Sequence, residues 1–201
     1  LLLSNMAAYD LGYIGAVEFV TRTENTLETL VKLTTFNGHL FNWYSTENLD
    51  PVEPRYVSTV DSGNLVAALI VLKQFALRFG LNVKRSFEPR TGRYEGVRDT
   101  IRPLLIHVSK DSRFEKNNRE IFDELKRLLK TEPRDTSHQE TLLEELKSYL
   151  DRIELNGDEN EELLWWLNAS KRIVETHLVD YERPQDLGSR LIAISNDADG
   201  F

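Results

Sequence analysis

The residues best suited to chemistry gather in one segment, residues 38–64, which reads GHLFNWYSTENLDPVEPRYVSTVDSGN. It combines flat rings with short hydrogen-bonding side chains. Rings suit the apolar C–H faces of a sugar, and amide, guanidinium and carboxylate groups suit its hydroxyls. We therefore expect a sugar-binding surface, with these candidate contact residues: Asn42, Trp43, Tyr44, Arg55, Tyr56, Asp61 and Asn64.

Asp61 is the only candidate for a catalytic role, and no other catalytic residue is assigned. Glycoside chemistry needs two carboxylates, about 5 to 9.5 Å apart. We expect a helix to begin at Asp61 or Ser62, where the helix dipole and free N–H groups would stabilise an anion. Such a carboxylate suits a base or a hydrogen-bond acceptor better than a general acid. The alternative, that Asp61 only caps the helix, is equally open.

Other chemistries find little support. The four histidines show no spacing typical of metal ligands, so no metal site is predicted: His39, His107, His138 and His177. The absence of cysteine excludes thiolate catalysis, and neither a nucleophile elbow nor a phosphate-binding glycine loop occurs. We expect no cofactor.

The net charge and the hydropathy of the chain exclude some classes of binding partner. The net charge of -8 argues against nucleic acid and anionic membranes, both of which reward positive charge. No apolar run reaches the ~18 residues typical of a spanning helix. We therefore expect a soluble segment without direct membrane contact.

The elements that must position the loop are predicted to be helices. In the first part, residues 1–80, the periodicity predicts a helix ending near Asp10 with Gly12 as its stop, a helix from Ile14 to Phe36 closed by Gly38, and an apolar helix from Gly63 to Phe79. Pro51 and Pro54 keep the segment between the last two helices irregular. The third helix is apolar nearly all round, so it should lie buried between neighbours.

The second part, residues 81–201, reads as charged, amphipathic helices near 97–108, 117–130, 139–153, 161–178 and 185–196. Within Leu163–Leu167, at least one ring of the Trp165–Trp166 pair should belong to the core. Residues 55–60 could form one short strand, but a lone strand makes no sheet. The pattern predicts an all-α fold of helical hairpins with an additional charged helical region.

Two strings carry a family resemblance: Asn42-Trp43-Tyr44, and Pro54-Arg55-Tyr56-Val57-Ser58-Thr59-Val60-Asp61-Ser62-Gly63-Asn64-Leu65. Together with the stretch from Leu2 to Gly15, they resemble the glucoamylase-like middle region of bacterial cyclic β-1,2-glucan synthases. The resemblance covers about the first 75 residues.

The resemblance implies part of an (α/α)-barrel-like domain in an enzyme that closes linear β-1,2-glucan into rings by transglycosylation. It implies that the loop faces the glucan cleft and that the main catalytic acids lie beyond this chain. The parent would be membrane-anchored on the cytoplasmic side of the bacterial inner membrane, and the partners would be glucan and other domains of that parent. Where the family commonly has Asp after Asn-Trp-Tyr, this chain has Ser45, which removes a charge at the cleft edge.

Two alternatives stay open. The chain could be a non-catalytic helical scaffold whose charged second part docks a partner. It could also belong to a hydrolase of related glucans, with Asp61 as the base.

Overall fold

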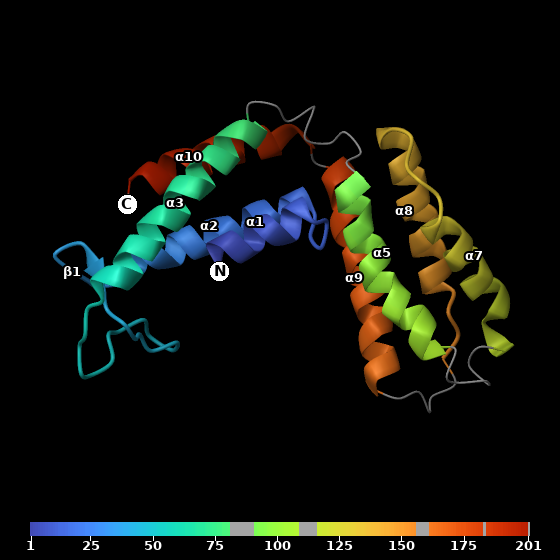
Figure 1. The fold of residues 1–201 in the computed structure, drawn as a ribbon, viewed down its shortest axis with the longest axis horizontal. Coiled ribbons are helices and arrows are strands. Elements are labelled where there is room, and N and C mark those ends of the chain that lie inside the picture. The colour runs from blue at the N-terminus through green and yellow to red at the C-terminus, as the bar shows by residue number, and fades with distance from the viewer. Residues whose placement is uncertain (81–90, 109–115, 156–160, 183, 201) are drawn as a thin grey trace. The chain divides into compact units, whose positions relative to one another are not determined.

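The computed structural model describes residues 1–80, 91–108, 116–155, 161–182 and 184–200. Helices dominate these ranges, so the predicted all-α class is confirmed (Figure 1). The elements are α1 (Leu2–Asp10), α2 (Ala16–Lys32), β1 (Thr35–Phe36), β2 (His39–Leu40), α3 (Thr59–Gly80), α5 (Thr91–Val108), α7 (Arg119–Leu129), α8 (Thr136–Asp151), α9 (Glu161–Glu182) and α10 (Pro184–Asp199). The barrel arrangement stays a prediction.

The chain forms two compact units. The first unit comprises the described residues of Leu1–Met6, Val20–Asn82 and Asp186–Phe201, and the second those of Ala7–Phe19 and Val83–Gln185. Helices α1, α2 and α10 therefore each contribute residues to both units. The domain boundary predicted near residue 80 falls at the end of α3 and stays a prediction.

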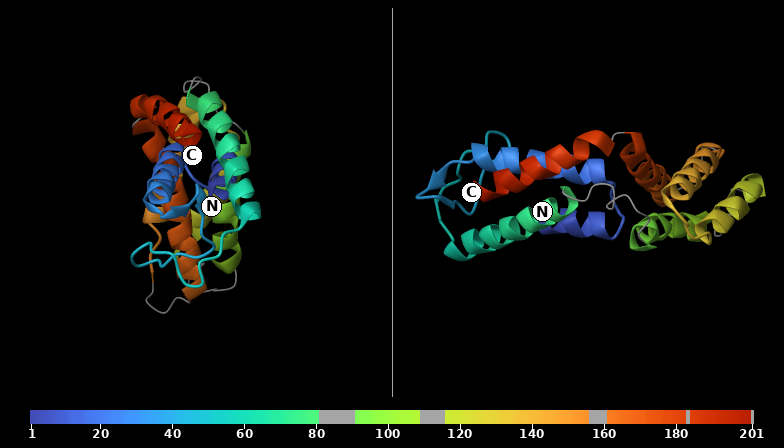
Figure 2. Two further views of the ribbon diagram at one scale, coloured as in Figure 1. Left: turned by 90° about the vertical axis from the view of Figure 1, so that its left-hand side faces the viewer. Right: turned by 90° about the horizontal axis from the view of Figure 1, so that it is seen from above.

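The second unit has a continuous aliphatic core. Helix α5 packs along α9, α9 along α8, and α8 along α7, as Figure 2 also shows. The core residues recur three and four positions apart on each helix, which puts them on one face. Its fully buried members include Val97, Ile101 and Leu104 of α5 and Leu143, Leu146 and Leu150 of α8. Trp166 packs against this core, which confirms the prediction for that ring.

Helix α9 clamps the turn between α1 and α2 within the second unit. The turn closes α1 as predicted: Gly12 has φ 80°, and the Tyr13 N–H donates to Ala8 O at 2.7 Å. The buried His177 Nε2 lies 2.9 Å from Gly12 O. The buried Asp180 carboxylate accepts from the N–H groups of Ala16 (2.7 Å) and Val17 (2.9 Å), so α9 supplies the cap for the first turn of α2.

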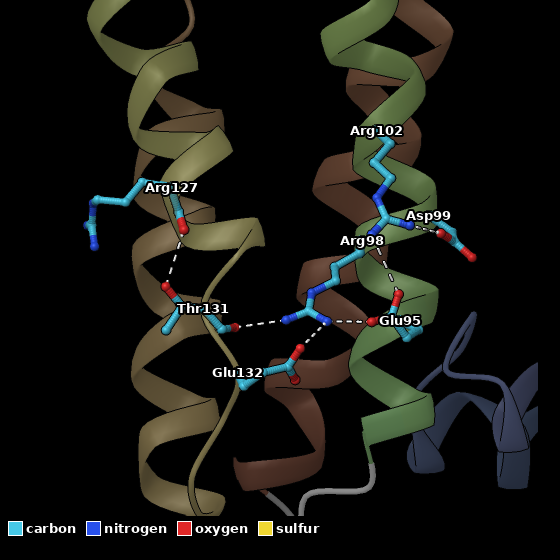
Figure 3. A network of polar contacts seen from close by, with 7 residues as sticks. All are labelled: Glu95, Arg98, Asp99, Arg102, Arg127, Thr131 and Glu132. Carbon is cyan, nitrogen blue, oxygen red and sulfur yellow. Dashed lines mark hydrogen bonds and ion pairs between the residues drawn. The ribbon is translucent and has the colours of Figure 1, made fainter.

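A buried arginine ties α5 to the segment between α7 and α8 (Figure 3). Arg98 donates to Glu132 Oε1 (2.8 Å), to Thr131 O (3.0 Å) and to Glu95 on its own helix. Burial alone would lower the pKa of Arg98, but the bonds to Glu132 and Glu95 outweigh it and raise the pKa. Arg98 also lies over the Tyr94 ring, and burial raises the pKa of Tyr94 to about 12.

In the first unit, α2 ends earlier than predicted. The helix stops at Lys32, and residues 35–40 form a hairpin that pairs Thr35 with Leu40 and Phe36 with His39. Asn37 (φ 51°) and Gly38 (φ 81°) provide the two left-handed residues that a type I′ turn needs. The prediction of a helix through Phe36 was wrong because the β-branched Thr34-Thr35 and the Asn-Gly pair favour a hairpin over a further helical turn.

Helix α3 also begins earlier than predicted, at Thr59. The hydroxyl of Ser58 accepts from the Asp61 N–H at 3.1 Å, so Ser58 is the cap. The predicted cap at Asp61 or Ser62 was wrong because an equally suitable hydroxyl stands one turn earlier. The possible strand over residues 55–60 reduces to one isolated bridge between Phe41 and Val57.

Helix α3 buries one face, not all of its surface. Leu69, Leu72, Ala76 and Phe79 are buried, whereas Val66, Ile70 and Val71 are 51%, 59% and 49% exposed. The prediction of burial between neighbours was therefore wrong for this face. Among the described residues, α3 is also the one helix long and apolar enough to cross a membrane by length and composition. The sequence-based exclusion of a spanning segment thus does not hold on those two criteria.

Candidate binding loop and the adjacent groove

The loop from residue 41 to residue 58, which we call the aromatic loop, doubles back on itself between β2 and α3. Isolated bridges join Phe41 to Val57 and Tyr44 to Pro51. Backbone bonds run from Asn42 N to Tyr56 O (2.9 Å) and from Val52 N to Trp43 O (3.0 Å). These bonds give the irregular segment a defined path, because they satisfy backbone groups that a coil would leave to water.

Tyr44 holds the base of the aromatic loop. Its half-buried hydroxyl donates to Thr34 O at 2.8 Å and accepts from the Phe41 N–H at 2.8 Å. Both bonds are to backbone, so they anchor the loop to the chain on either side of the hairpin. The Tyr44 ring is also in edge-to-face contact with Phe41, with the ring centroids 6.3 Å apart. The sugar contact predicted for Tyr44 stays a prediction.

Trp43 and Tyr56 form an exposed aromatic pair on the aromatic loop. Their ring centroids lie 6.0 Å apart at an interplanar angle of 73°, an edge-to-face contact. Trp43 is 53% exposed and Tyr56 is 57% exposed. The bond between Asn42 and Tyr56 brings together residues that are more than a dozen positions apart and so places the two rings side by side. A solvent-facing ring pair of this kind can stack on the apolar face of a sugar.

The polar candidates of the aromatic loop and of the first turns of α3 are in exposed positions. Arg55 Nε forms an ion pair with Glu53 Oε1 at 2.8 Å. Asn42, Asp61 and Asn64 are exposed, and Asp61 stands in the first turn of α3, where a carboxylate complements the free N–H groups. The roles predicted for these side chains stay predictions.

A groove of about 1100 Å³ lies beside the aromatic loop, within the first unit. The C-terminal half of α2, the hairpin, the N-terminal half of α3 and the end of α10 line it; these elements run side by side in Figures 1 and 2. Its lining residues are Glu24, Leu27, Glu28, Leu30, Val31, Leu33, Thr35, Gly38, His39, Leu40, Thr59, Ser62, Gly63, Leu65, Val66, Leu69, Asn196, Asp197 and Gly200.

The predicted contact residues do not line this groove, although the aromatic loop, which carries most of them, begins and ends at its edge. His39 and Leu40 precede the loop, Thr59 and Ser62 follow it, and all four line the groove. Sequence reasoning missed the groove residues. The spacing of Thr59, Ser62, Val66 and Leu69 puts them along one side of α3, but that spacing does not identify α2 and α10 as the other walls of the groove.

The other chemical candidates have structural partners. His107 Nε2 lies 3.1 Å from Glu162 Oε1, and the Arg134 N–H donates to His138 Nδ1 at 3.1 Å. In the part of the chain that the structure describes, no three histidine or acidic side chains gather to hold a metal. Trp165 is 61% exposed and contacts Trp166 edge to face, so the second unit offers a second exposed tryptophan for comparison with Trp43.

Comparison with known proteins relates one segment of the chain to a characterised protein. No family model matches the chain. The chain is 54% identical over 71 residues to the cyclic β-(1,2)-glucan synthase NdvB of Rhizobium meliloti (strain 1021). The match covers 35% of this chain and only 2% of the length of that protein. The similarity is confined to this matched segment, and it agrees with the family resemblance read from the sequence.

Proposed function

We propose that this chain is part of a bacterial enzyme that makes or cyclises β-1,2-glucan, and that the aromatic loop contributes a sugar-binding surface to it. The observation that carries the proposal is the 54% identity to a cyclic β-(1,2)-glucan synthase over 71 residues. The exposed pair of Trp43 and Tyr56 supports it, because a hydrogen-bonded loop that keeps two rings in solvent forgoes the gain from burying them. The parent enzyme is membrane-anchored on the cytoplasmic side in this proposal.

In this function the rings stack on glucose units and the surrounding polar groups bind hydroxyls. Asn42, Arg55 and Asn64 can donate hydrogen bonds to the sugar rim, and the carboxylate of Asp61 can accept them. The contribution of this chain is binding and orientation of the glucan, and the transglycosylation itself belongs to acids elsewhere in the parent. Under this proposal the chain by itself does not turn over linear β-1,2-glucan.

Intrinsic fluorescence provides the test of binding. Titration with β-1,2-gluco-oligosaccharides should change the tryptophan emission of the wild-type chain at millimolar sugar. The change should disappear in Trp43→Ala and persist in Trp165→Ala, a matched loss of an exposed tryptophan from the second unit. A wild-type chain without a response would contradict a sugar-binding loop and favour the scaffold alternative.

An activity assay tests whether this chain only binds the glucan and leaves catalysis to other parts of the parent. Incubation of the chain with linear β-1,2-glucan, followed by chromatography of the products, should show no new species. Cleaved or cyclised products that are lost in Asp61→Asn would show that this chain carries catalysis, as the hydrolase alternative requires.

A further inference from the structure

The groove in the first unit differs in chemistry from the aromatic loop beside it. Its floor is aliphatic and comes from two helices: Leu27 and Leu30 of α2, and Leu65 and Leu69 of α3. The lining includes neither tryptophan, tyrosine nor phenylalanine, in contrast to the loop. A glucan ring would therefore find no stacking surface there, whereas aliphatic side chains of a partner could pack against the floor.

The charge at the rim of the groove is one-sided. The acidic lining residues are Glu24, Glu28 and Asp197, and the lining holds neither lysine nor arginine. Glu24 is paired with Arg190 at 2.5 Å, which leaves Glu28 and Asp197 as exposed carboxylates. Glu28 is on α2 and Asp197 is near the end of α10, so the two come from different helices. A ligand that fits this rim carries positive charge beside an apolar surface.

We propose that the groove is a docking site for a basic amphipathic helix of a partner protein. Such a helix presents apolar anchors at positions i, i+3, i+4 and i+7, and lysine or arginine on its flanks. A volume of about 1100 Å³ corresponds to about 14 Å of a helix some 10 Å wide, or roughly nine residues. The aliphatic floor takes the anchors, and the carboxylates of Glu28 and Asp197 pair with the flanks.

The exposed face of α3 extends this docking surface. Val66 lines the groove, and Ile70 follows it one turn later with 59% of its surface exposed. At Gly63, also in the groove lining, an added Cβ would meet nothing within 4 Å, so a partner backbone can come close there. The docking surface therefore runs along α3 from the groove for at least another turn. It is independent of glucan binding by the aromatic loop.

Fluorescence anisotropy with the complete 201-residue chain tests the proposal. The probe is a fluorescein-labelled, 18-residue helical peptide of leucine and lysine with all leucines on one face. It should bind with micromolar affinity, and both a scrambled peptide of the same composition and a leucine–glutamate peptide of the same pattern should bind about tenfold more weakly or not at all. Equal binding of the patterned and scrambled peptides would overturn the proposal.

Variants of groove residues, each with a matched control, test whether the peptide binds in the groove. Val31→Asp and Asp197→Lys alter exposed groove residues and should each weaken binding about tenfold. Leu155→Asp and Glu144→Lys make the same kinds of change at exposed positions of the second unit and should leave binding within about twofold. Circular dichroism checks that all four variants keep their helix content. Equal losses in Asp197→Lys and Glu144→Lys would show bulk charge attraction, and equal binding by Val31→Asp and Leu155→Asp would show that the peptide does not use the apolar lining. Either result would overturn the proposal.

Self-association provides a separate check. Sedimentation velocity should show a monomer whose peptide binding is unchanged by protein concentration. A concentration-dependent dimer that Val31→Asp dissociates, and that excludes the peptide, would make a second copy of this chain the occupant and overturn the proposal.

Discussion

The core of the second unit and the groove side of the first unit use their apolar side chains in opposite ways. The second unit encloses its core: Tyr94, Ile101, Leu104, Leu125, Leu143, Leu146 and Leu150 have less than 2% of their surface exposed. The first unit has buried residues of its own, such as Leu72 and Ala76, but leaves Val31, Val66, Ile70 and Val71 in solvent along the groove and on the outer face of α3. Enclosed surface stabilises the fold, whereas open apolar surface is available to bind. The second unit therefore serves as the scaffold, and the first unit carries the candidate sites.

Polar groups follow the same division. In the second unit, buried side chains hold elements together: Asp180 caps α2 from α9, and Arg98 joins α5 to the segment after α7. In the first unit, most polar side chains of the aromatic loop are exposed. The loop is fixed by backbone bonds, by the Tyr44 hydroxyl and by short-range bonds of Ser45, Asn48 and Asp50 within the loop itself. This difference predicts that substitutions in the second unit cost stability and that substitutions around the loop and groove cost binding.

The largest expected effect on stability comes from a substitution in the core of the second unit. Leu146→Ala removes a fully buried side chain of α8 and leaves a cavity, so the free energy of unfolding should fall by about 3–4 kcal/mol. Ile70→Ala in α3 removes an exposed side chain and should change it by less than about 0.5 kcal/mol. Urea denaturation followed by circular dichroism measures both. Similar losses in the two variants would mean that the face of α3 is covered in solution.

The next effect tests the clamp on the α1–α2 turn. Asp180→Ala leaves the N–H groups of Ala16 and Val17 without their acceptor, which should cost about 2–3 kcal/mol of unfolding free energy. The exposed Asp186, in the first turn of α10, serves as control, and Asp186→Ala should cost no more than about 1 kcal/mol. Amide hydrogen exchange should show faster exchange at Ala16 and Val17 in Asp180→Ala. Unchanged protection there would contradict the clamp.

A smaller effect comes from the buried phenol of the second unit. Burial raises the pKa of Tyr94 from 10.0 to about 12, so the folded state keeps a proton that the unfolded state releases. Below pH 10 the Tyr94 hydroxyl is protonated in both states, and its contribution to the free energy of unfolding is fully present. As the pH rises from 10 through 12 this contribution is lost, and at pH 11 the free energy of unfolding is lower by about 1.4 kcal/mol. Tyr94→Phe removes it, so the difference in unfolding free energy between variant and wild type should grow over that range.

The same variant has an informative result at neutral pH. The Tyr94 hydroxyl is buried without a hydrogen-bond partner among the described residues. Tyr94→Phe should therefore leave stability at pH 7 unchanged or raise it by up to about 1 kcal/mol. A clear loss at pH 7, or parallel pH curves for the two proteins from pH 9 to 12, would contradict the burial of the phenol.

Helix-forming patterns made the scaffold predictable from sequence. Residues such as Leu143, Leu146 and Leu150 recur at helical spacing, and that spacing alone places them on one buried face. Gly12 likewise marked the end of α1, because few other residues adopt its positive φ easily. These features are local, so the chain around each residue contains the information needed to predict them.

The wrong predictions have two causes. Local sequence signals competed with one another at element boundaries, and the burial of a helix face depends on residues that are distant in the sequence. At Asn37-Gly38 a hairpin turn won over a further turn of helix, and at Ser58 one hydroxyl capped α3 ahead of two later candidates. The exposure of each face of α3 depends on which helices pack against it, and the uniformly apolar sequence of α3 does not indicate which face is covered. The groove needs α2, α3 and α10 together, so spacing within one segment could not reveal it.

The smallest expected effect is that of Gly63→Ala in the first unit, and Gly15 in the second unit provides the contrast. At Gly63 in α3 an added Cβ meets open space, so Gly63→Ala should raise the unfolding free energy by about 0.5–1 kcal/mol through the higher helix propensity of alanine. At Gly15 an added Cβ would lie 2.2 Å from the backbone oxygen of Thr176 in α9, so the same change there should be destabilising. Thermal unfolding of the two variants therefore gives shifts of opposite sign if the first unit is open where the second is closed. A destabilising Gly63→Ala would show that another element packs against α3 in solution, and the contrast between the units would then fail where it predicts binding.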